Sequence, residues 1–528
     1  MQIEKRRLLL AVPATVLLCS LLGGFFGSRV VEAAATAESD VADSIRRFTD
    51  VLAVVEQNYA DEVDAEKAIY SGSVPNLLHT LDPHSQFFDP EQFQQLRDEQ
   101  KGEYAGVGMQ IGPGNGNTVV VIAPFPKTPA YKAGLRPRDI IAEVDGEAMD
   151  TKDVGEVAKR LRGPVGTEVK IGVMRRGVDS MLNFTVTRGA IVYPSISSAF
   201  FIEPEVGFIK LDRFNETTGK ELDQALEDFN KTGLKGLVLD LRKNRGGLLS
   251  EGVYVSDTFL ERGKTIVSHY GRSSPERKYE AKRGNGGDMF PMIVMVDCDS
   301  ASASEIVAGA LQDHDRALIV GTPTFGKGLV QTVFPIGRTA GLALTTARYY
   351  TPSGRLIQRN YDDVSLWKYY ADPCSEEYKP NTDDVRLTDQ GRRVYGGGGI
   401  APDVRIAQAK PNEFQLTLWR SSAVQTFAQE YTLKRPDLAP GWDVTPEVVE
   451  EFRQFLYHEK IEFVEADFSA NTDFIARMVK REVYVSAYDL AEGERVKHTL
   501  DPDVQEALKL MPQAKDLLKS SGRVIAQK

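Results

Sequence analysis

Between residues 190 and 360, short apolar segments alternate with stretches of helical periodicity. Residues 207–211 precede a segment in which Leu222 and Phe229 keep helical spacing, and residues 236–241 and 293–296 are two further apolar runs. A strand buried on both faces of a parallel sheet has such a continuous apolar run. Alternating strands and helices favour a parallel sheet covered by helices. The sequence therefore predicts an α/β core over this part of the chain.

Other parts of the 528-residue chain have different patterns. Residues 38–100 carry apolar side chains at helical spacing, the next stretch is rich in glycine and short strands, and the tail is mostly of helical character. We expect an α/β multidomain protein with these parts: a signal peptide or N-terminal anchor at 1–35, a helical N-terminal region at 36–100, a compact block at 101–189, the core at 190–408 with a polar insertion at 359–395, and a helical C-terminal extension at 409–528.

The N-terminus has the features of an export signal. Lys5, Arg6 and Arg7 precede an uncharged run over residues 8–28, and small residues follow at 33–37. This order is typical of a cleaved secretory signal, but the run is also long enough to remain as a membrane anchor. In either case we expect an exported protein, periplasmic or otherwise extracytoplasmic. In the second case residues 8–28 would hold it in the inner membrane.

Charge and metal-binding residue types exclude several functions. The 64 Lys and Arg residues against 75 Asp and Glu residues give a net charge of −11, so nucleic acid is not an expected partner. Cys19, Cys298 and Cys374 form no CxxC pair, and the six histidines are scattered. We therefore predict no metal site and no cofactor. The sequence leaves open whether Cys298 and Cys374 form a disulfide.

The block at 101–189 resembles a PDZ domain. Three segments carry the resemblance: a glycine loop of Gly106, Val107, Gly108 and Met109, a short helix at 129–134 that ends in glycine, and a strand at 139–144 that runs into an Asp-Gly turn. In a PDZ domain the backbone N–H groups of such a loop hold a peptide's C-terminal carboxylate, and the adjacent strand edge accepts the peptide as an extra strand. Taken singly, each glycine indicates no more than a turn.

Three serines follow the apolar run at 293–296, in the sequence DSASASE at 299–305. A hydroxyl at a helix N-terminus lies where the helix dipole favours a developing oxyanion. The alternative interpretation is a capping box, in which Ser302 accepts a bond from the backbone and Glu305 bonds back.

A serine nucleophile needs a base, and no histidine lies in a telling motif. A lysine can serve if its pKa falls from about 10.4 toward 7–8, and burial lowers the pKa of a lysine. Lys327 lies between two glycines in an apolar stretch. If residues 327 and 331 share a strand, they face the same side, so that Gln331 could orient the lysine without adding a charge. Taken alone, Lys327 and Gln331 would be surface residues.

The segments 300–311 and 321–331 closely resemble the C-terminal processing peptidases, or tail-specific proteases, which are Ser–Lys serine proteases with an embedded PDZ domain. The stretches 239–249, 349–355, 399–403 and 81–85 agree with the same family, so the resemblance covers about residues 55–405. Arg245 stands where proline is common in the family. The insertion at 359–395 and the tail match no known pattern.

The resemblance implies a ClpP/crotonase-like core and a set of functional residues. Ser302 would be the nucleophile, Lys327 the general base and Gln331 its partner, while the N–H groups of Gly246 and Ala303 would form the oxyanion hole. Arg162 matches a position proposed to couple the PDZ domain to the active site, although it is otherwise an ordinary exposed cation. The implied partners are unfolded or loosely folded proteins that are bound by their C-terminal tails. An adaptor protein and a homo-oligomer stay open.

Three alternatives remain from the sequence. The chain could be a non-catalytic PDZ scaffold with a peptidase-like core, although a decayed core should have lost Ser302, Lys327 or Gln331. It could be a serine hydrolase that uses a histidine, such as His84 or His269, as its base. Independently of both, the tail could serve interaction or oligomerisation instead of catalysis.

Overall fold

The computed structural model describes residues 41–525, apart from residues 115, 117, 150–151, 286–288, 363, 372–380 and 408–409, and only the backbone of residues 521–525. The predicted signal or anchor at 1–35 and the cysteines Cys19 and Cys374 lie outside the described residues. The chain forms two compact units, Met1–Leu81 and Asp82–Lys528. Every helix in the described part of the chain is too short or too polar to cross a membrane.

The first unit is helical where it is described. A helix covers residues 41–58, and it is followed by α2 (Ala65–Lys67), the π-helix η1 (Ala68–Ser73) and α3 (Val74–His79). Asp64 caps α2, because its carboxylate accepts a hydrogen bond from the Lys67 N–H at 3.0 Å. The long helix exposes a row of apolar side chains, and these belong to the apolar residues at helical spacing that the sequence shows in this region.

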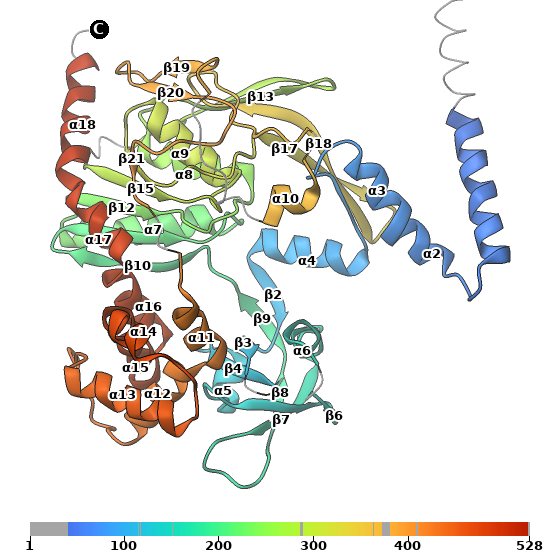
Figure 1. Ribbon diagram of the computed structural model, residues 1–528. Coiled ribbons are helices and arrows are strands. Elements are labelled where there is room, and N and C mark those ends of the chain that lie inside the picture. Colours follow the sequence, from blue (N-terminus) through green and yellow to red (C-terminus); the bar gives the residue numbers. More distant parts are fainter. Residues whose placement is uncertain are drawn as a thin grey trace, which may run out of the picture. The chain divides into compact units, whose positions relative to one another are not determined.

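The centre of the second unit is a six-stranded sheet (Figure 1). Its strands, in spatial order, are β10 (Ile196–Glu203), β11 (Val206–Leu211), β12 (Gly236–Asp240), β15 (Met292–Val296), β16 (Leu318–Gly321) and β21 (Val404–Arg405). β10 is antiparallel to β11, and the other neighbours pair in parallel. The apolar runs seen in the sequence are these strands, which are buried on both faces.

Helices from two distant parts of the chain cover the two faces of this sheet. Helices α7 (Thr218–Thr232), α8 (Leu249–Phe259) and α9 (Ala303–Asp313) pack against Ile209, Leu239 and Val294. On the other face, α17 (Pro502–Lys509) and α18 (Met511–Ile525) pack against Phe208, Val238 and Ile293. The end of the C-terminal extension therefore completes the core of the α/β domain, as Figure 1 shows for α18 along β15.

An antiparallel sheet lies next in the second unit. It contains β1 (Gln86–Phe88), β18 (Ala340–Tyr350), β13 (Thr265–Gly271) and β14 (Ser274–Glu280) in this order, and β17 (Leu329–Ile336) also pairs with β18. Helix α4 (Pro90–Lys101) follows β1. The described part of the insertion forms α10 (Leu366–Ala371) and the hairpin of β19 (Val385–Leu387) and β20 (Arg393–Tyr395).

The block at 101–189 has its own sheet and its own apolar core. The sheet order is β3 (Met109–Pro113), β4 (Val119–Pro124), β5 (Ile140–Val144), β7 (Glu168–Met174) and β8 (Leu182–Thr187), with β6 (Glu147–Ala148) on β5. The helices are α5 (Pro129–Ala133) and α6 (Val154–Leu161), and the ribbon of β2 (Glu103–Gly106) and β9 (Gly189–Val192) joins the block to the core. β3 is an edge strand, so one of its sides is free to pair.

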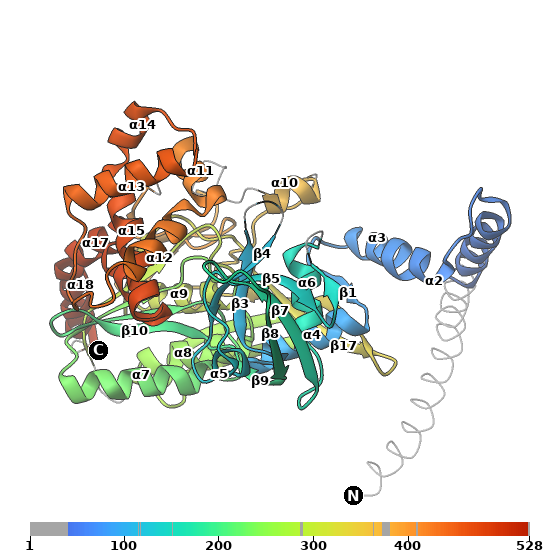
Figure 2. The ribbon, with the colours of Figure 1, turned by 90° about the horizontal axis from the view of Figure 1, so that it is seen from below.

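The rest of the C-terminal extension is a helical bundle, seen as a group of orange and red helices in Figure 2. Helices α11 (Glu413–Ser421), α12 (Ala423–Leu433), α13 (Pro446–His458), α14 (Glu465–Ala470) and α15 (Thr472–Ala487) surround a shared apolar core, and α16 (Leu490–Thr499) packs against α15. The bundle touches the block at 101–189, because Arg138 donates to the Thr426 hydroxyl at 2.6 Å and Gln429 donates to the Pro137 carbonyl at 3.0 Å.

Candidate active site

The three serines at the junction of β15 and α9 have different surroundings. The hydroxyls of Ser300 and Ser304 are buried and donate to the carbonyls of Leu241 and Asn244, both at 2.8 Å. Ser302 is only partly buried and lines a cleft of about 410 Å³. Two of the serines therefore hold the turn in place, and the third is presented to the cleft.

The backbone at Ser302 has an unusual conformation. Its φ of 56° and ψ of −112° are uncommon for a residue with a side chain, and it directly precedes α9. Such conformations cost free energy and persist only where the surrounding structure imposes them. The same turn is the capping box that the sequence indicated, with the Glu305 carboxylate accepting from the Ser302 N–H at 2.8 Å. Capping and presentation of the hydroxyl are therefore compatible.

The carboxylate of Glu305 ties the serine turn to the lysine loop. It is fully buried and accepts four hydrogen bonds: from the N–H of Ser302 at 2.8 Å, the Thr324 hydroxyl at 2.6 Å, and the N–H groups of Gly326 at 2.7 Å and Lys327 at 2.9 Å. The pKa of Glu305 is raised above its ordinary value, because burial outweighs the hydrogen bonds, which lower it. All four partners donate, and an ionised carboxylate offers about four acceptor sites, so this geometry suits the charged form.

Lys327 and Gln331 form a pair beside this hub. The Lys327 Nζ donates to the Gln331 Oε1 at 2.9 Å, and the Gln331 Nε2 donates to the backbone carbonyl of His84. Burial lowers the pKa of Lys327 below its ordinary value of 10.5, while the charges of Glu305 and Asp82 raise it. Burial therefore shifts the amine toward its neutral form, the form that a general base requires.

The expected geometry of this pair is wrong in one respect. The sequence placed residues 327 and 331 on one strand, but β17 begins at Leu329 and Lys327 lies in the loop before it. The pairing register of β17 with β18 also shifts between Val330 and Gln331. The two side chains still meet, although Lys327 lies two residues before the strand begins.

One cleft brings the predicted catalytic residues together. Its walls come from the serine turn, the lysine loop, the glycine loop after β12, and α4 with its preceding strand; they include Phe88, Leu96, Gln100, Arg213, Gly246, Gly247, Leu248, Ser302, Ile306, Lys327, Val330, Gln331 and Tyr349. The hydroxyl of Tyr349 also donates to the Ser302 carbonyl at 3.2 Å, which supports the turn from below.

Gly246 packs directly against the serine turn. A Cβ at this position, with its φ of 94°, would lie 2.7 Å from the Ala301 oxygen and 2.9 Å from the Ala303 nitrogen, so only glycine fits. Its N–H donates to the Asn244 Oδ1 at 2.9 Å. Ala303 is the first residue of α9, where a backbone N–H has no acceptor within the helix. Of the two expected oxyanion donors, Ala303 is therefore the one that helix geometry makes available.

The histidines considered as alternative bases do not line the cleft. The ring of His84 contacts the hydroxyls of Tyr369 and Tyr370 at 3.0 and 2.9 Å, and burial lowers its pKa to about 3. His269 lies on β13, where its Nε2 is 3.4 Å from the Tyr279 hydroxyl. The geometry therefore favours the lysine over either histidine.

In the glycine loop before β3, the carbonyls point into the block. The Val107 carbonyl accepts from Ala130 N at 2.8 Å, and the Gly108 carbonyl accepts from Phe125 N at 3.0 Å. In a trans peptide unit the C=O of one residue and the N–H of the next point in opposite directions. The N–H groups of Gly108 and Met109 therefore point away from these partners. Together with Gly106, all of these loop residues are buried, so a ligand reaches them only if neighbouring side chains move.

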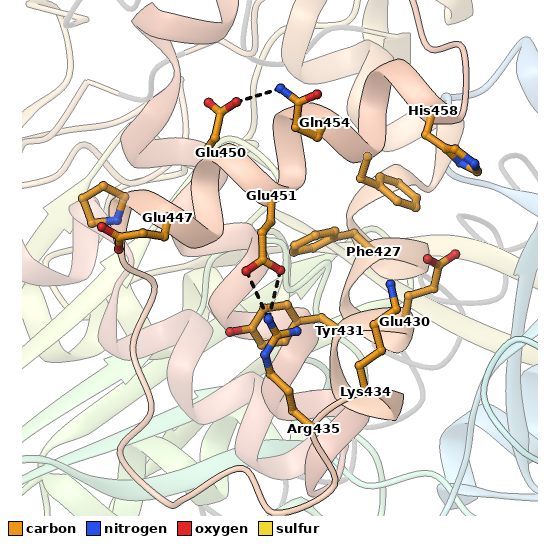
Figure 3. Close-up of a pocket in the computed structure, with 12 residues that line it drawn as sticks. Phe427, Glu430, Tyr431, Lys434, Arg435, Glu447, Glu450, Glu451, Gln454 and His458 are labelled. Carbon is orange, nitrogen blue, oxygen red and sulfur yellow. Dashed lines mark hydrogen bonds and ion pairs between the residues drawn. The ribbon is translucent and has the colours of Figure 1, made fainter.

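Two further features of the described residues concern possible metal binding and a second hollow. Among the described residues, no three His, Cys, Asp or Glu side chains are grouped as a metal site would need. A larger hollow of about 850 Å³ lies between α12 and α13 (Figure 3). There Arg435 forms an ion pair with Glu451 at 3.1 Å, and Gln454 donates a hydrogen bond to Glu450 at 2.8 Å.

Comparison with known proteins follows this geometry. A model of peptidase family S41 matches residues 205–364, and a PDZ domain model matches residues 120–175. A carboxy-terminal-processing protease of Bartonella bacilliformis is 39% identical over 325 residues, which are 61% of this chain and 74% of that protein. A carboxyl-terminal-processing protease of Synechocystis is 38% identical over 292 residues, covering 54% and 68% of the two chains. A solved photosystem II D1 C-terminal processing protease is 28% identical with a TM-score of 0.35, covering 68% and 92%.

Ser302, directly before α9, and the desolvated Lys327 line one cleft, and the PDZ domain model matches within the block at 101–189. The chain belongs to peptidase family S41. The expected family, the α/β multidomain fold and the enzyme class are confirmed, so the scaffold alternative is wrong. The roles of individual site residues remain predictions.

Sequence reasoning missed several residues that shape the site. Glu305 was considered only as a helix cap, and Asn244 was not considered at all. The sequence did contain a sign of both residues. Glu305 is an acidic residue at the start of an otherwise apolar helix, and Asn244 stands two residues before a pair of glycines. Tyr369 and Tyr370 belong to the insertion, for which the sequence offered no pattern.

Replacing Glu305 by glutamine should damage both stability and catalysis. Glutamine has one acceptor oxygen and an NH₂ group that faces donors, so buried donors lose partners at a cost of about 1–3 kcal/mol. We expect a lower free energy of unfolding in urea and a reduced peptidase rate for Glu305→Gln. Glu276→Gln, on the exposed face of β14, is the matched control and should behave as wild type. Equal stability of the two variants would contradict the role of Glu305.

Proposed function

We propose that this peptidase is an endopeptidase that binds loosely folded proteins by their C-terminal tails and cleaves them near that end. The PDZ domain captures the tail, and Ser302, Lys327 and Gln331 perform the cleavage. The observation that carries the proposal is the hydrogen bond from Lys327 to Gln331 in the same cleft that the partly buried Ser302 lines.

In the proposed reaction, the Ser302 Oγ attacks a peptide carbonyl and the neutral Lys327 amine takes the hydroxyl proton. The Ala303 N–H stabilises the tetrahedral oxyanion, and Gly246 adds a second N–H when its bond to Asn244 opens; one such donor contributes about 3–4 kcal/mol. Lys327 then gives the proton to the departing amine, and water hydrolyses the acyl ester by the same steps. Gln331 carries no charge, so it orients the amine without keeping it protonated.

Removing either reacting group should abolish cleavage. We expect Ser302→Ala and Lys327→Ala to lose turnover of an unstructured, tagged protein by about 10⁴-fold or more, as in other serine proteases. Ser273→Ala and Lys278→Ala, both exposed on the β13–β14 hairpin, are matched controls and should cleave normally. Wild-type turnover by Ser302→Ala or Lys327→Ala would overturn the assignment.

The pH dependence distinguishes a lysine base from a histidine base. The lysine acts only when neutral, and burial lowers its pKa below 10.5. We therefore expect kcat/KM to rise with pH and to reach half its maximum below pH 10.5, with activity lost as the pH falls and Lys327 becomes protonated. A half-maximum near pH 6.5 that disappears in a His84 or His269 variant would instead indicate a histidine base.

The structure offers a physical route from the PDZ domain to the cleft. The guanidinium of Arg162 lies 5.2 Å from the centre of the Tyr104 ring, and that ring meets Tyr193 edge-on at 6.4 Å. The guanidinium of Arg213 lies 3.4 Å from the Tyr193 ring and lines the cleft. Arg162 also borders Gly106 of the glycine loop. These contacts support a coupling role for Arg162.

Arg162→Ala should separate tail binding from activation. We expect peptides with a free C-terminal carboxylate, but not amidated ones, to stimulate cleavage by the wild type, and we expect Arg162→Ala to lose this stimulation while its basal rate persists. Lys170→Ala, an exposed cation of the same domain, is the control. Unchanged stimulation of Arg162→Ala would remove the coupling role.

We also propose that the protein is exported, with residues 8–28 as a signal or an inner-membrane anchor. Cys298 is disulfide-bonded, and disulfides persist in oxidising compartments such as the periplasm. Fractionation of cells that express the full chain tests this proposal, and recovery of the chain from the cytoplasm would contradict it.

Finally, we propose that two copies assemble through the helix at 41–58. Apolar residues recur along it at alternating intervals of four and three, the spacing of a coiled-coil seam: Val41, Ile45, Phe48 and Val55 are exposed, Leu52 is partly buried, and Tyr59 continues the spacing just after the helix. Val51 and Val54 are also exposed, beside this seam. Monomeric behaviour in sedimentation at micromolar concentration would contradict the assembly. An adaptor protein stays a prediction of the family resemblance.

A further inference from the structure

The insertion places two tyrosines on one histidine ring. Tyr369 and Tyr370 are neighbours on α10, and their hydroxyls lie 3.0 Å from the Nε2 and 2.9 Å from the Nδ1 of His84. The three rings pack edge to face, with centroids 5.1 to 5.8 Å apart. Both polar edges of the imidazole are therefore held by a segment that belongs to neither sheet.

The hydrogen bonds of this cluster have one consistent direction. Tyr370 donates to the Pro83 carbonyl at 2.6 Å, so it accepts the proton of the His84 Nδ1. The Nε2 of His84 then accepts from the Tyr369 hydroxyl, which itself accepts from Gln358 at 3.2 Å. A neutral imidazole satisfies every member of this chain, in agreement with the low pKa of His84.

Arg359 fixes α10 to the lysine loop. Its guanidinium lies over the rings of Phe325 at 4.5 Å and Tyr369 at 4.6 Å, and its Nη2 donates to the Tyr369 carbonyl at 2.7 Å. Its backbone N–H donates to the Gly326 carbonyl at 2.8 Å. The loop that carries Lys327 is thus held by Glu305 from one side and by the insertion from the other.

The backbone of His84 determines which way the Gln331 amide points. The His84 carbonyl accepts from the Gln331 Nε2, so the Oε1 is directed to the Nζ of Lys327 at 2.9 Å. The reversed amide would set an oxygen against the carbonyl and an NH₂ group against the amine. Asp82 supports the same turn, because its Oδ1 accepts from the N–H groups of His84 and Ser85, both at 2.7 Å.

We propose that Tyr369 and Tyr370 are positioning residues of the peptidase: they hold His84, whose carbonyl orients Gln331 and through it the lone pair of Lys327. The inference rests on the proposed catalytic function of Lys327 and Gln331. In this proposal the insertion orients Lys327 through His84 and Gln331, and it does not contact the substrate.

The test is the double variant Tyr369→Phe/Tyr370→Phe, which keeps both rings and removes both hydroxyls. We expect kcat to fall about ten- to a hundredfold, since a small misplacement of a catalytic group has such an effect, while KM stays near that of the wild type. The thermal midpoint should fall modestly, because the His84 ring and the Pro83 carbonyl lose buried partners. In a Gln331→Ala background, the same pair should change kcat less than about twofold, because residues that act through one partner are not additive. Trp367→Ala, which is 82% exposed on the same helix, is the control and should be unaffected.

These measurements test the catalytic set and the positioning role of the tyrosines separately. Wild-type kcat for Ser302→Ala or Gln331→Ala would overturn the catalytic set itself, and the positioning role with it. An impaired Gln331→Ala beside a wild-type tyrosine pair would overturn only the positioning. An equal loss in both backgrounds would also overturn it, because the tyrosines would then act independently of Gln331. If the double variant does not fold, the single variant Tyr369→Phe is measured in both backgrounds in its place.

Discussion

The active site depends on one buried carboxylate. Glu305 accepts hydrogen bonds from the backbone of the nucleophile turn and from the backbone of the lysine loop. These two segments belong to different sheets, since the turn follows β15 of the parallel sheet and the loop precedes β17 of the antiparallel one. Burying a charge is costly unless it is fully paired, and here four donors pair it. The same arrangement places a negative charge near Lys327, whose pKa nevertheless falls because burial outweighs it.

The buried side-chain amide of Asn244 joins the glycine loop, another wall of the cleft, to the serine turn. Asn244 accepts from Gly246 through its side chain, donates to the Leu211 carbonyl at 2.8 Å, and its own carbonyl accepts from Ala301 and Ser304. The glycine loop, the end of β11 and the serine turn are thus connected through one residue. These hydrogen bonds hold the segments around the predicted oxyanion donors Gly246 and Ala303 together.

Much of the architecture could be predicted because it is local. The buried strands gave uninterrupted apolar runs, and the PDZ domain gave glycine turns at its expected spacing. The C-terminal extension was predicted to be helical, yet its pattern did not reveal that α17 and α18 cover a face of the central sheet. That face alternates residue by residue with the other, as Phe208 and Ile209 show. A sequence pattern shows that both faces are buried, but it does not identify what covers them.

The sequence by itself, through its resemblance to the family, predicted the catalytic set of Ser302, Lys327 and Gln331, a set that needs neither a histidine nor a metal. Those residues lie in short motifs, and a short motif can be recognised without knowledge of the fold. The tertiary structure decided how the base is held, because Asp82, His84, Glu305, Tyr369 and Lys327 come from segments far apart in the chain. Hydrogen bonds across such distances leave no periodic trace in a sequence, since each requires only one polar residue at one position.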